Sequence, residues 1–214
     1  MDEDIEIINT NTRIEKAKNF FINNKKILVS CFSIIILLIF SYFFYEERVE
    51  KNKKKIANNY NSAYINFISS DKISAKIEMV KIIQSKDKTY APLALYFLID
   101  NNIIKSELEI NKNFDILINE IKLDKEIQNL IIYKKALFNS DFETENNLLK
   151  ILNPILNSES IWKSHSLYLI GEYFLSKNEK QKAKEFFEKI LSLENSNPNV
   201  RIEAQKRIQR DFSE

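Results

Sequence analysis

Glycine occurs once in this chain of 214 residues, at position 171. A phosphate-binding P-loop needs two glycines and a dinucleotide-binding turn needs three, so neither motif is present. The two-residue turns of β-hairpins also depend on glycine, which disfavours an all-β fold. The chain is therefore expected to bind no nucleotide cofactor and to fold without extensive β-hairpins.

Cysteine and histidine also occur once each, as Cys31 and His165. A single cysteine allows no internal disulfide and no cysteine-based zinc site, and a single histidine allows no two-histidine metal or catalytic centre. Lys and Arg number 32 against 30 for Asp and Glu, so the net charge of +2 creates no basic field that would favour nucleic acid. These counts predict no metal, no cofactor, no catalytic residues and no nucleic-acid partner.

Residues 27–45 form a run of 19 residues without a charge. As a helix this run spans about 29 Å, which matches a hydrocarbon core of about 30 Å. The alternatives are a buried core helix and a cleaved leader. Cys31 lies at the start of the apolar run, whereas a lipidated cysteine lies at its end, and no small-residue cleavage site follows residue 45. We therefore predict a retained anchor in the lipid bilayer, with a tail at 1–26, a membrane helix at 27–45 and a soluble domain at 46–214.

The orientation of the anchor is weakly encoded. Five Lys or Arg residues precede the segment within about twenty positions and five follow it, so the positive-inside tally is a tie. The contrast between Lys25-Lys26 before the segment and Glu46-Glu47 after it favours a cytoplasmic N-terminus. No Gly or Pro occurs between Asn24 and Ser69, so we expect one helix to continue from the anchor into the soluble domain.

The soluble part shows helical spacing of apolar residues nearly throughout, with short breaks rich in Asn, Asp and Ser. One expected stripe consists of Ile73, Ile77 and Val80. No stretch shows sustained strand alternation. We predict an all-α domain.

The clearest unit lies at residues 161–193 and resembles a tetratricopeptide repeat, a pair of helices that packs at small residues. Asn178 is the expected N-cap of its second helix. Because glycine is a poor helix former, Gly171→Ala is expected to be neutral or stabilising, whereas Gly171→Leu is expected to overpack the hairpin. The residues that match the repeat pattern are Leu167, Ile170, Gly171, Phe174, Ala183 and Phe187.

Equivalent positions 35 residues earlier are Ala136, Leu148 and Leu152, which gives a period close to 34. Residues 90–121 resemble a more degenerate copy. Pro198 follows Asn197 and is expected to open a terminal helix that caps the repeats. The predicted architecture is therefore one membrane helix followed by a solenoid of helical hairpins.

Several aromatic residues are candidates for a concave partner-binding surface, because aromatic side chains make good anchors at interfaces. Core packing is the alternative role for each of them, and His165 either lines a groove or is structural. The candidates are Tyr90, Tyr96, Tyr133, Trp162 and Tyr168.

Three groups of residues carry a resemblance to a known family. They are 14–21 with Asn24 and Lys25, then Thr89, Tyr90, Leu93, Ala94 and Leu98, and finally 169–171, 175–177, Lys180 and Ala183. With these residues, the whole layout resembles a bacterial family, the tetratricopeptide-repeat-like ancillary subunit of the Sec translocon. The resemblance implies a periplasmic repeat domain on a single inner-membrane anchor, without catalysis or a small-molecule substrate. It also implies partners among the Sec channel subunits and a membrane-anchored periplasmic chaperone, in the handling of emerging secreted proteins. Two further classes stay open: a repeat scaffold of cytochrome c maturation or cell-wall synthesis, and an enzyme of unrecognised type.

Overall fold

The computed structural model describes residues 14–16 and 18–212, which form helices joined by short turns, with no strand among them. Residues 1–13 of the expected tail, and Ala17 within the segment of family resemblance, lie outside the described residues. The chain divides into two units, residues 1–55 and residues 56–214. The predicted all-α fold is confirmed.

Helix α2 (Lys25–Ile68) is 44 residues long and contains no Gly or Pro, as predicted for an uninterrupted helix. None of the residues in its most apolar 18-residue window is buried. The helix is long and apolar enough to cross a membrane, a property that it shares with N-terminal secretion signals. Because the window is exposed, its composition is not explained by packing in a protein core.

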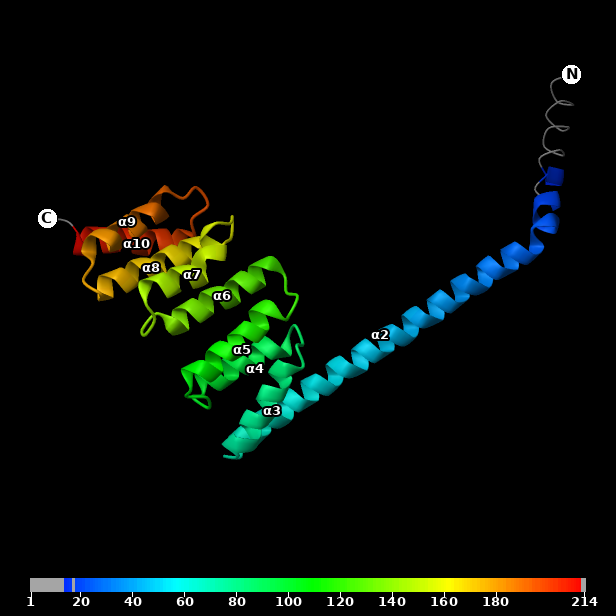
Figure 1. Cartoon of the computed structure of the whole chain (residues 1–214), viewed down its shortest axis with the longest axis horizontal. Helices are drawn as coiled ribbons and strands as arrows, with labels where there is room; N and C mark the ends of the chain where they lie inside the picture. Colours follow the sequence, from blue (N-terminus) through cyan, green and yellow to red (C-terminus); the bar gives the residue numbers. More distant parts are fainter. Residues whose placement is uncertain (1–13, 17, 213–214) are drawn as a thin grey trace, which may run out of the picture. The chain divides into compact units, whose positions relative to one another are not determined.

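The unit of residues 56–214 continues from the end of α2 through shorter helices that follow one another in chain order (Figure 1). Each helix from α3 onward packs against the next, and contacts also join α3 with α5, α6 with α8, and α8 with α10. This pattern is typical of stacked helical hairpins of the tetratricopeptide type. The helices are α3 (Lys72–Gln84), α4 (Tyr90–Asp100), α5 (Glu107–Asn119), α6 (Lys125–Asn139), α7 (Glu145–Leu156), α8 (Lys163–Ser176), α9 (Lys180–Ser192) and α10 (Pro198–Asp211).

The shortage of glycine has a direct effect on how these helices end. Among the described residues, Ser70, Lys86, Asn102 and Asn178 adopt positive φ angles between 50° and 68°. Each lies two residues after the end of a helix, at the position where glycine is most common because it carries no Cβ. The chain therefore places other residues in the left-handed conformation at these four helix ends.

The prediction that Asn178 caps α9 was wrong. The backbone N–H of Asn178 donates to the carbonyl of Leu175 at 3.0 Å, and the N–H of Glu179 donates to the carbonyl of Phe174 at 2.9 Å. These two bonds form a Schellman motif, so Asn178 ends α8. Glu179 is the N-cap residue of α9 and makes no side-chain capping bond. At α10 the prediction was correct, because Pro198 is the first residue of the helix. The Asn197 side chain caps it by accepting from the backbone N–H groups of residues 199 and 200.

Two apolar cores fill the unit of residues 56–214. The first runs from the end of α2 to α6, the second runs from α6 to α10, and partly buried Ile118 packs against both. The predicted stripe on α3 was wrong, because Ile73 is 76% exposed and Ile77 is 50% exposed. The buried residues of α3 are Ala75, Met79, Ile82 and Ile83.

The residues of the predicted repeat pattern lie together in the second core. The position that a Cβ on Gly171 would take lies 2.6 Å from Cε1 and 2.8 Å from Cζ of Phe187, whose side chain is completely buried. This close approach joins α8 to α9. Leu167, Ile170, Gly171, Phe174, Ala183 and Phe187 are all buried, as are Ala136, Leu148 and Leu152 of the preceding pair.

Polar contacts between helices recur at nearly the repeat period. The Lys76 ammonium lies 2.9 Å from a carboxylate oxygen of Glu109, which is 33 positions later. The Ser160 hydroxyl donates to the Glu126 carboxylate at 2.7 Å, across 34 positions. Both separations are close to the predicted period of 34, so these contacts join equivalent parts of successive hairpins.

Candidate protein-binding surface

The first helices of the successive hairpins, α4, α6 and α8, together with the terminal helix α10, form a layer, which we call the inner layer. Helix α6 contacts α8, and α8 contacts α10. Between α4 and α6, the ammonium of Lys134 lies 4.7 Å from the centre of the Tyr96 ring. Side chains from all four helices therefore take part in contacts within this layer.

The structure brings two of the predicted aromatic candidates into direct contact. The rings of Tyr133 on α6 and Trp162 at the start of α8 stack, with centroids 5.7 Å apart and planes inclined by 22°. The His165 ring lies 5.1 Å from Trp162 and 6.0 Å from Tyr133. All three residues are partly exposed, and together they form what we call the aromatic cluster.

A hydrogen-bonded turn fixes the position of Trp162. Its indole N–H donates to the backbone carbonyl of Glu126 at 3.1 Å, and its backbone N–H donates to the Ser160 hydroxyl at 3.1 Å. The carboxylate of Glu126 accepts from the same hydroxyl and from the backbone N–H of Ile161. Because the hydrogen bonds hold one edge of the indole, its exposed part is presented in a defined orientation.

His165 titrates in an apolar environment. Burial lowers the pKa of His165 below its ordinary value of 6.5, and a weaker interaction with the backbone of Ile161 opposes this shift. The Nδ1 atom is buried and has no hydrogen-bond partner among the described residues. The imidazole is therefore mainly neutral at pH 7, and the aromatic cluster carries no charge of its own.

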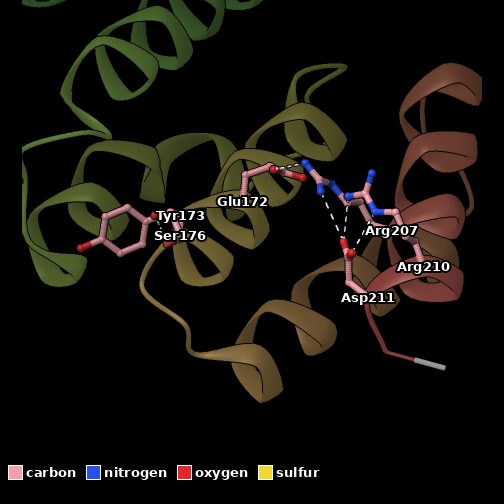
Figure 2. Close-up of polar contacts among 6 residues, drawn as sticks. All are labelled: Glu172, Tyr173, Ser176, Arg207, Arg210 and Asp211. Carbon is pink, nitrogen blue, oxygen red and sulfur yellow. Dashed lines mark hydrogen bonds and ion pairs between the residues drawn. The ribbon is translucent and has the colours of Figure 1, made fainter. Parts of the chain in front are cut away.

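A charged cluster occupies the other end of the inner layer, where α8 meets α10 (Figure 2). The Arg207 guanidinium lies 2.6 Å from the Glu172 carboxylate and 3.3 Å from that of Asp211. Arg210 forms two further bonds to Asp211, at 2.8 and 2.9 Å. Figure 2 also shows Tyr173 and Ser176 on α8, away from the charged cluster. The cluster joins the terminal helix to the last full hairpin.

Two further aromatic candidates, Tyr90 and Tyr168, lie outside the aromatic cluster. Tyr90 packs against Tyr60 of α2, with ring centroids 5.7 Å apart. Tyr168 is on α8, and its ring lies 5.4 Å from that of Phe187. Burial and the neighbouring Glu172 carboxylate raise the pKa of Tyr168 to about 12. Both tyrosines pack against other rings, whereas Tyr133 and Trp162 form the partly exposed aromatic cluster and Tyr96 contacts Lys134.

Sequence reasoning did not identify the charged cluster. Glu172 and Arg207 are 35 positions apart, so comparison of opposite charges one repeat apart would have found the pair. Across the described residues, no group of three or more His, Cys, Asp or Glu side chains is placed to hold a metal ion. The chemistry that this surface offers is aromatic contact at the cluster of Tyr133 and Trp162 and ion pairing where α8 meets α10.

Comparisons with protein-family models, with curated proteins and with solved structures found no match to this chain.

Proposed function

We propose that this chain is a membrane-anchored, non-catalytic protein-interaction module. Residues 27–45 cross the bacterial inner membrane, the tail lies in the cytoplasm, and the hairpin domain lies in the periplasm. Its partners are subunits of the Sec translocon and a membrane-anchored periplasmic chaperone, as the family resemblance implies. The module assists in the handling of emerging secreted proteins.

One observation carries the proposal. Within α2, the apolar window is wholly exposed, whereas Ile56 and Ala63 near the end of the same helix are buried in the first core of the hairpin unit. One continuous helix thus contains a segment suited to lipid and a segment that belongs to a helical repeat domain. Attachment of a docking domain to a membrane raises its effective concentration near membrane-bound partners.

The partly exposed aromatic cluster supports protein binding as the role of the hairpin domain. Stacked Tyr133 and Trp162 offer a large apolar surface with little loss of side-chain freedom on binding, because they are already ordered. The cluster is uncharged at neutral pH, so it suits a protein surface better than a phosphorylated ligand.

Site-specific photocrosslinking in native membranes tests this proposal. A photoreactive residue at position 165, within the aromatic cluster, is expected to crosslink to Sec channel subunits or to a membrane-anchored periplasmic chaperone. The matched control is a probe at Leu108, an 81% exposed residue of α5 outside the inner layer, which is expected to give little of these products. Exclusive recovery of cytochrome-assembly or cell-wall proteins would favour the alternative scaffold, and identical products from both positions would remove the aromatic cluster as the docking surface.

A further inference from the structure

A short helical segment precedes the apolar run of α2. Residues 14–16 and 18–23 are helical, and Asn24 lies in a turn between them and α2. The carbonyl of Phe20 accepts from the backbone N–H of Asn24 at 3.0 Å and from its side-chain amide at 2.9 Å. Asn24 therefore separates these residues from the long helix. We call residues 14–16 and 18–24 the entry segment.

Large apolar side chains of the entry segment are not covered by protein. Ile14 is 65% exposed, Phe20 is 57% exposed and Phe21 is 62% exposed. At the helical period of 3.6 residues, these three positions fall within an arc of about 120°. The entry segment therefore presents an apolar face directly before a run of residues that is itself apolar and exposed.

Lysines flank this apolar face. At the same helical period, Lys16 lies about 40° from Phe20 at one edge of the arc, and Lys18 lies about 40° from Ile14 at the other edge. Two more lysines follow at the start of α2. All four side chains are exposed, and none of them forms an ion pair with another described residue: Lys16, Lys18, Lys25 and Lys26.

The basic residues after the apolar run are partly neutralised. Lys51 lies 2.7 Å from a carboxylate oxygen of Glu47, and Lys54 lies 2.7 Å from one of Glu50. The entry segment includes a single acidic residue, Glu15, and the other acidic residues before α2, at positions 2, 3, 4 and 6, are farther from the apolar run in the sequence. Unpaired positive charge is therefore concentrated where the apolar run begins.

A straight continuation of α2 would leave the apolar face in water. Phe20 is seven residues before Ile27, so a straight helix would place it about 10 Å outside the hydrocarbon core, and Ile14 would lie about 20 Å outside. The headgroup layer on each side of a bilayer is only about 5–8 Å thick. A segment that turns at Asn24 and lies along the membrane surface instead brings these side chains to the boundary between headgroups and acyl chains.

We propose that the entry segment is an interfacial helix that binds the anionic phospholipid headgroups of the leaflet in which the apolar run begins. Phe20 and Phe21 insert between the lipids, and the flanking lysines extend along the segment toward the headgroup phosphates. The unpaired lysines favour an anionic surface over a neutral one, and continuity with the apolar run brings that surface to them. The inference rests on the proposed function in one respect, namely that residues 27–45 cross a membrane.

Site-directed spin labelling of the full chain in lipid vesicles tests the inference. Each variant carries Cys31→Ser, and the label is attached at Phe21→Cys on the apolar face or at the matched control Asn19→Cys, about 160° around the helix. In vesicles of phosphatidylcholine with phosphatidylglycerol, the label at position 21 is expected to be accessible to oxygen, which dissolves in lipid. The label at position 19 is expected to be accessible to a water-soluble nickel complex.

Charge variants test the choice of lipid. Lys16→Gln with Lys18→Gln removes two lysines, and is expected to reduce the ratio of inserted to water-exposed label at position 21 about tenfold or more. The matched control, Lys53→Gln with Lys55→Gln, removes two unpaired lysines after the apolar run and is expected to leave this ratio unchanged. Vesicles of phosphatidylcholine alone are expected to give a lower ratio than the anionic vesicles.

Equal accessibility at positions 19 and 21 would overturn the interfacial helix. An equal inserted fraction in neutral and anionic vesicles, or in the wild type and the Lys16→Gln, Lys18→Gln variant, would overturn the binding of anionic headgroups. A label at Ile36→Cys, within the apolar run, separates these results from failure of the proposed function. If that label lies in the hydrocarbon, only the present inference fails, whereas a water-exposed label at position 36 would overturn the membrane anchor as well.

Discussion

Gly171 and Phe187 are packed so closely that a methyl group on Gly171 has no room, because its position lies 2.6 Å from Cε1 of the phenylalanine ring. This contact leads us to expect a loss of stability for Gly171→Ala, in place of the neutral or stabilising effect that helix propensity alone predicts. Alanine improves helix propensity by about 1 kcal/mol, but forced repacking in a filled core costs about 1–3 kcal/mol. The buried ring of Phe187 has no adjacent solvent into which it could move.

Gly171→Ala is predicted to lower the free energy of unfolding by about 1 kcal/mol and Gly171→Leu by about 3 kcal/mol or more. The measurement is urea unfolding of the full chain in detergent, followed by the fluorescence of Trp162, the only tryptophan. Unchanged stability of the Leu variant would show that α8 and α9 do not approach closely at this position.

The hairpin of α6 and α7 suggests a second change that should relieve the steric clash in Gly171→Ala. Ala136 and Leu152 occupy the positions equivalent to Gly171 and Phe187, and both are completely buried. A larger residue on one helix is thus matched by a smaller one on the other. The double variant Gly171→Ala with Phe187→Leu reproduces this pair, and it is expected to be more stable than the sum of the two single changes predicts, by about 1 kcal/mol. Strict additivity would contradict the steric explanation.

The positive φ angles of non-glycine residues after the helix ends predict that a change to glycine there stabilises the protein. Ser70 has a φ of 68° after the end of α2, and a non-glycine residue in this region carries steric strain. Ser70→Gly is expected to raise the free energy of unfolding by about 0.5–1 kcal/mol, after allowance for the greater freedom of glycine in the unfolded chain. The matched control is Ser69→Gly, one residue earlier, where φ is not positive and a loss of about 0.5 kcal/mol is expected. A loss in both variants would count against strain at Ser70.

His165 gives the aromatic cluster a pH dependence. Because its pKa is lower in the folded state than its ordinary value of 6.5, the unfolded chain binds more protons at mildly acidic pH. The contribution of neutral His165 to stability is therefore fully present above pH 6.5 and is lost as the pH falls through the folded-state pKa. An imidazolium quenches a nearby indole, so the fluorescence of folded Trp162 is expected to fall with a midpoint below pH 6.5. His165→Phe should remove this transition, and a midpoint above 6.5 would contradict the assignment.

One ring on α4 contacts three aromatic side chains in the last helical turns of α2. Phe97 on α4 is buried and lies 5.2 Å from Phe67, 5.9 Å from Tyr64 and 6.3 Å from Tyr60, measured between ring centroids. Phe97→Ala is expected to lower the free energy of unfolding by about 3–5 kcal/mol. Leu108→Ala removes a mostly exposed side chain and is expected to change stability by less than about 0.5 kcal/mol. Similar losses in both variants, measured by urea unfolding, would show that the Phe97 contacts contribute little.

Most of the fold could be predicted because helical periodicity and repeat spacing are local signals. The uninterrupted α2, the hairpin around Gly171 and the start of α10 at Pro198 all follow from residues close together in the chain. The buried face of α3 could not be predicted, because α3 carries isoleucines on both of its faces and only contacts with other helices decide which are covered. Ile73 and Ile77 are on the exposed face, whereas Ile82 and Ile83 are buried.

The candidate surface was predicted only in part, for a similar reason. Residue type identified Tyr133 and Trp162 as candidates, but their stacking depends on how α6 meets α8. The same reasoning included Tyr90, which packs against Tyr60 of α2. Single residues reveal that an aromatic anchor is available, and the helix packing determines which ones lie together.

The central claim is that the hairpin domain is tethered to the membrane on its outer side, and cysteine accessibility tests it most directly. Both variants carry Cys31→Ser, so that the introduced cysteine is the one that can be labelled. The first has Lys122→Cys in the exposed turn between α5 and α6, and the matched variant has Lys18→Cys before the apolar segment. Intact cells are treated with a maleimide that does not cross the inner membrane. The proposed topology predicts labelling of the Lys122→Cys variant in intact cells and of the Lys18→Cys variant only after lysis. Labelling of Lys122→Cys only after lysis would contradict an outward-facing domain and, with it, the role at the Sec translocon.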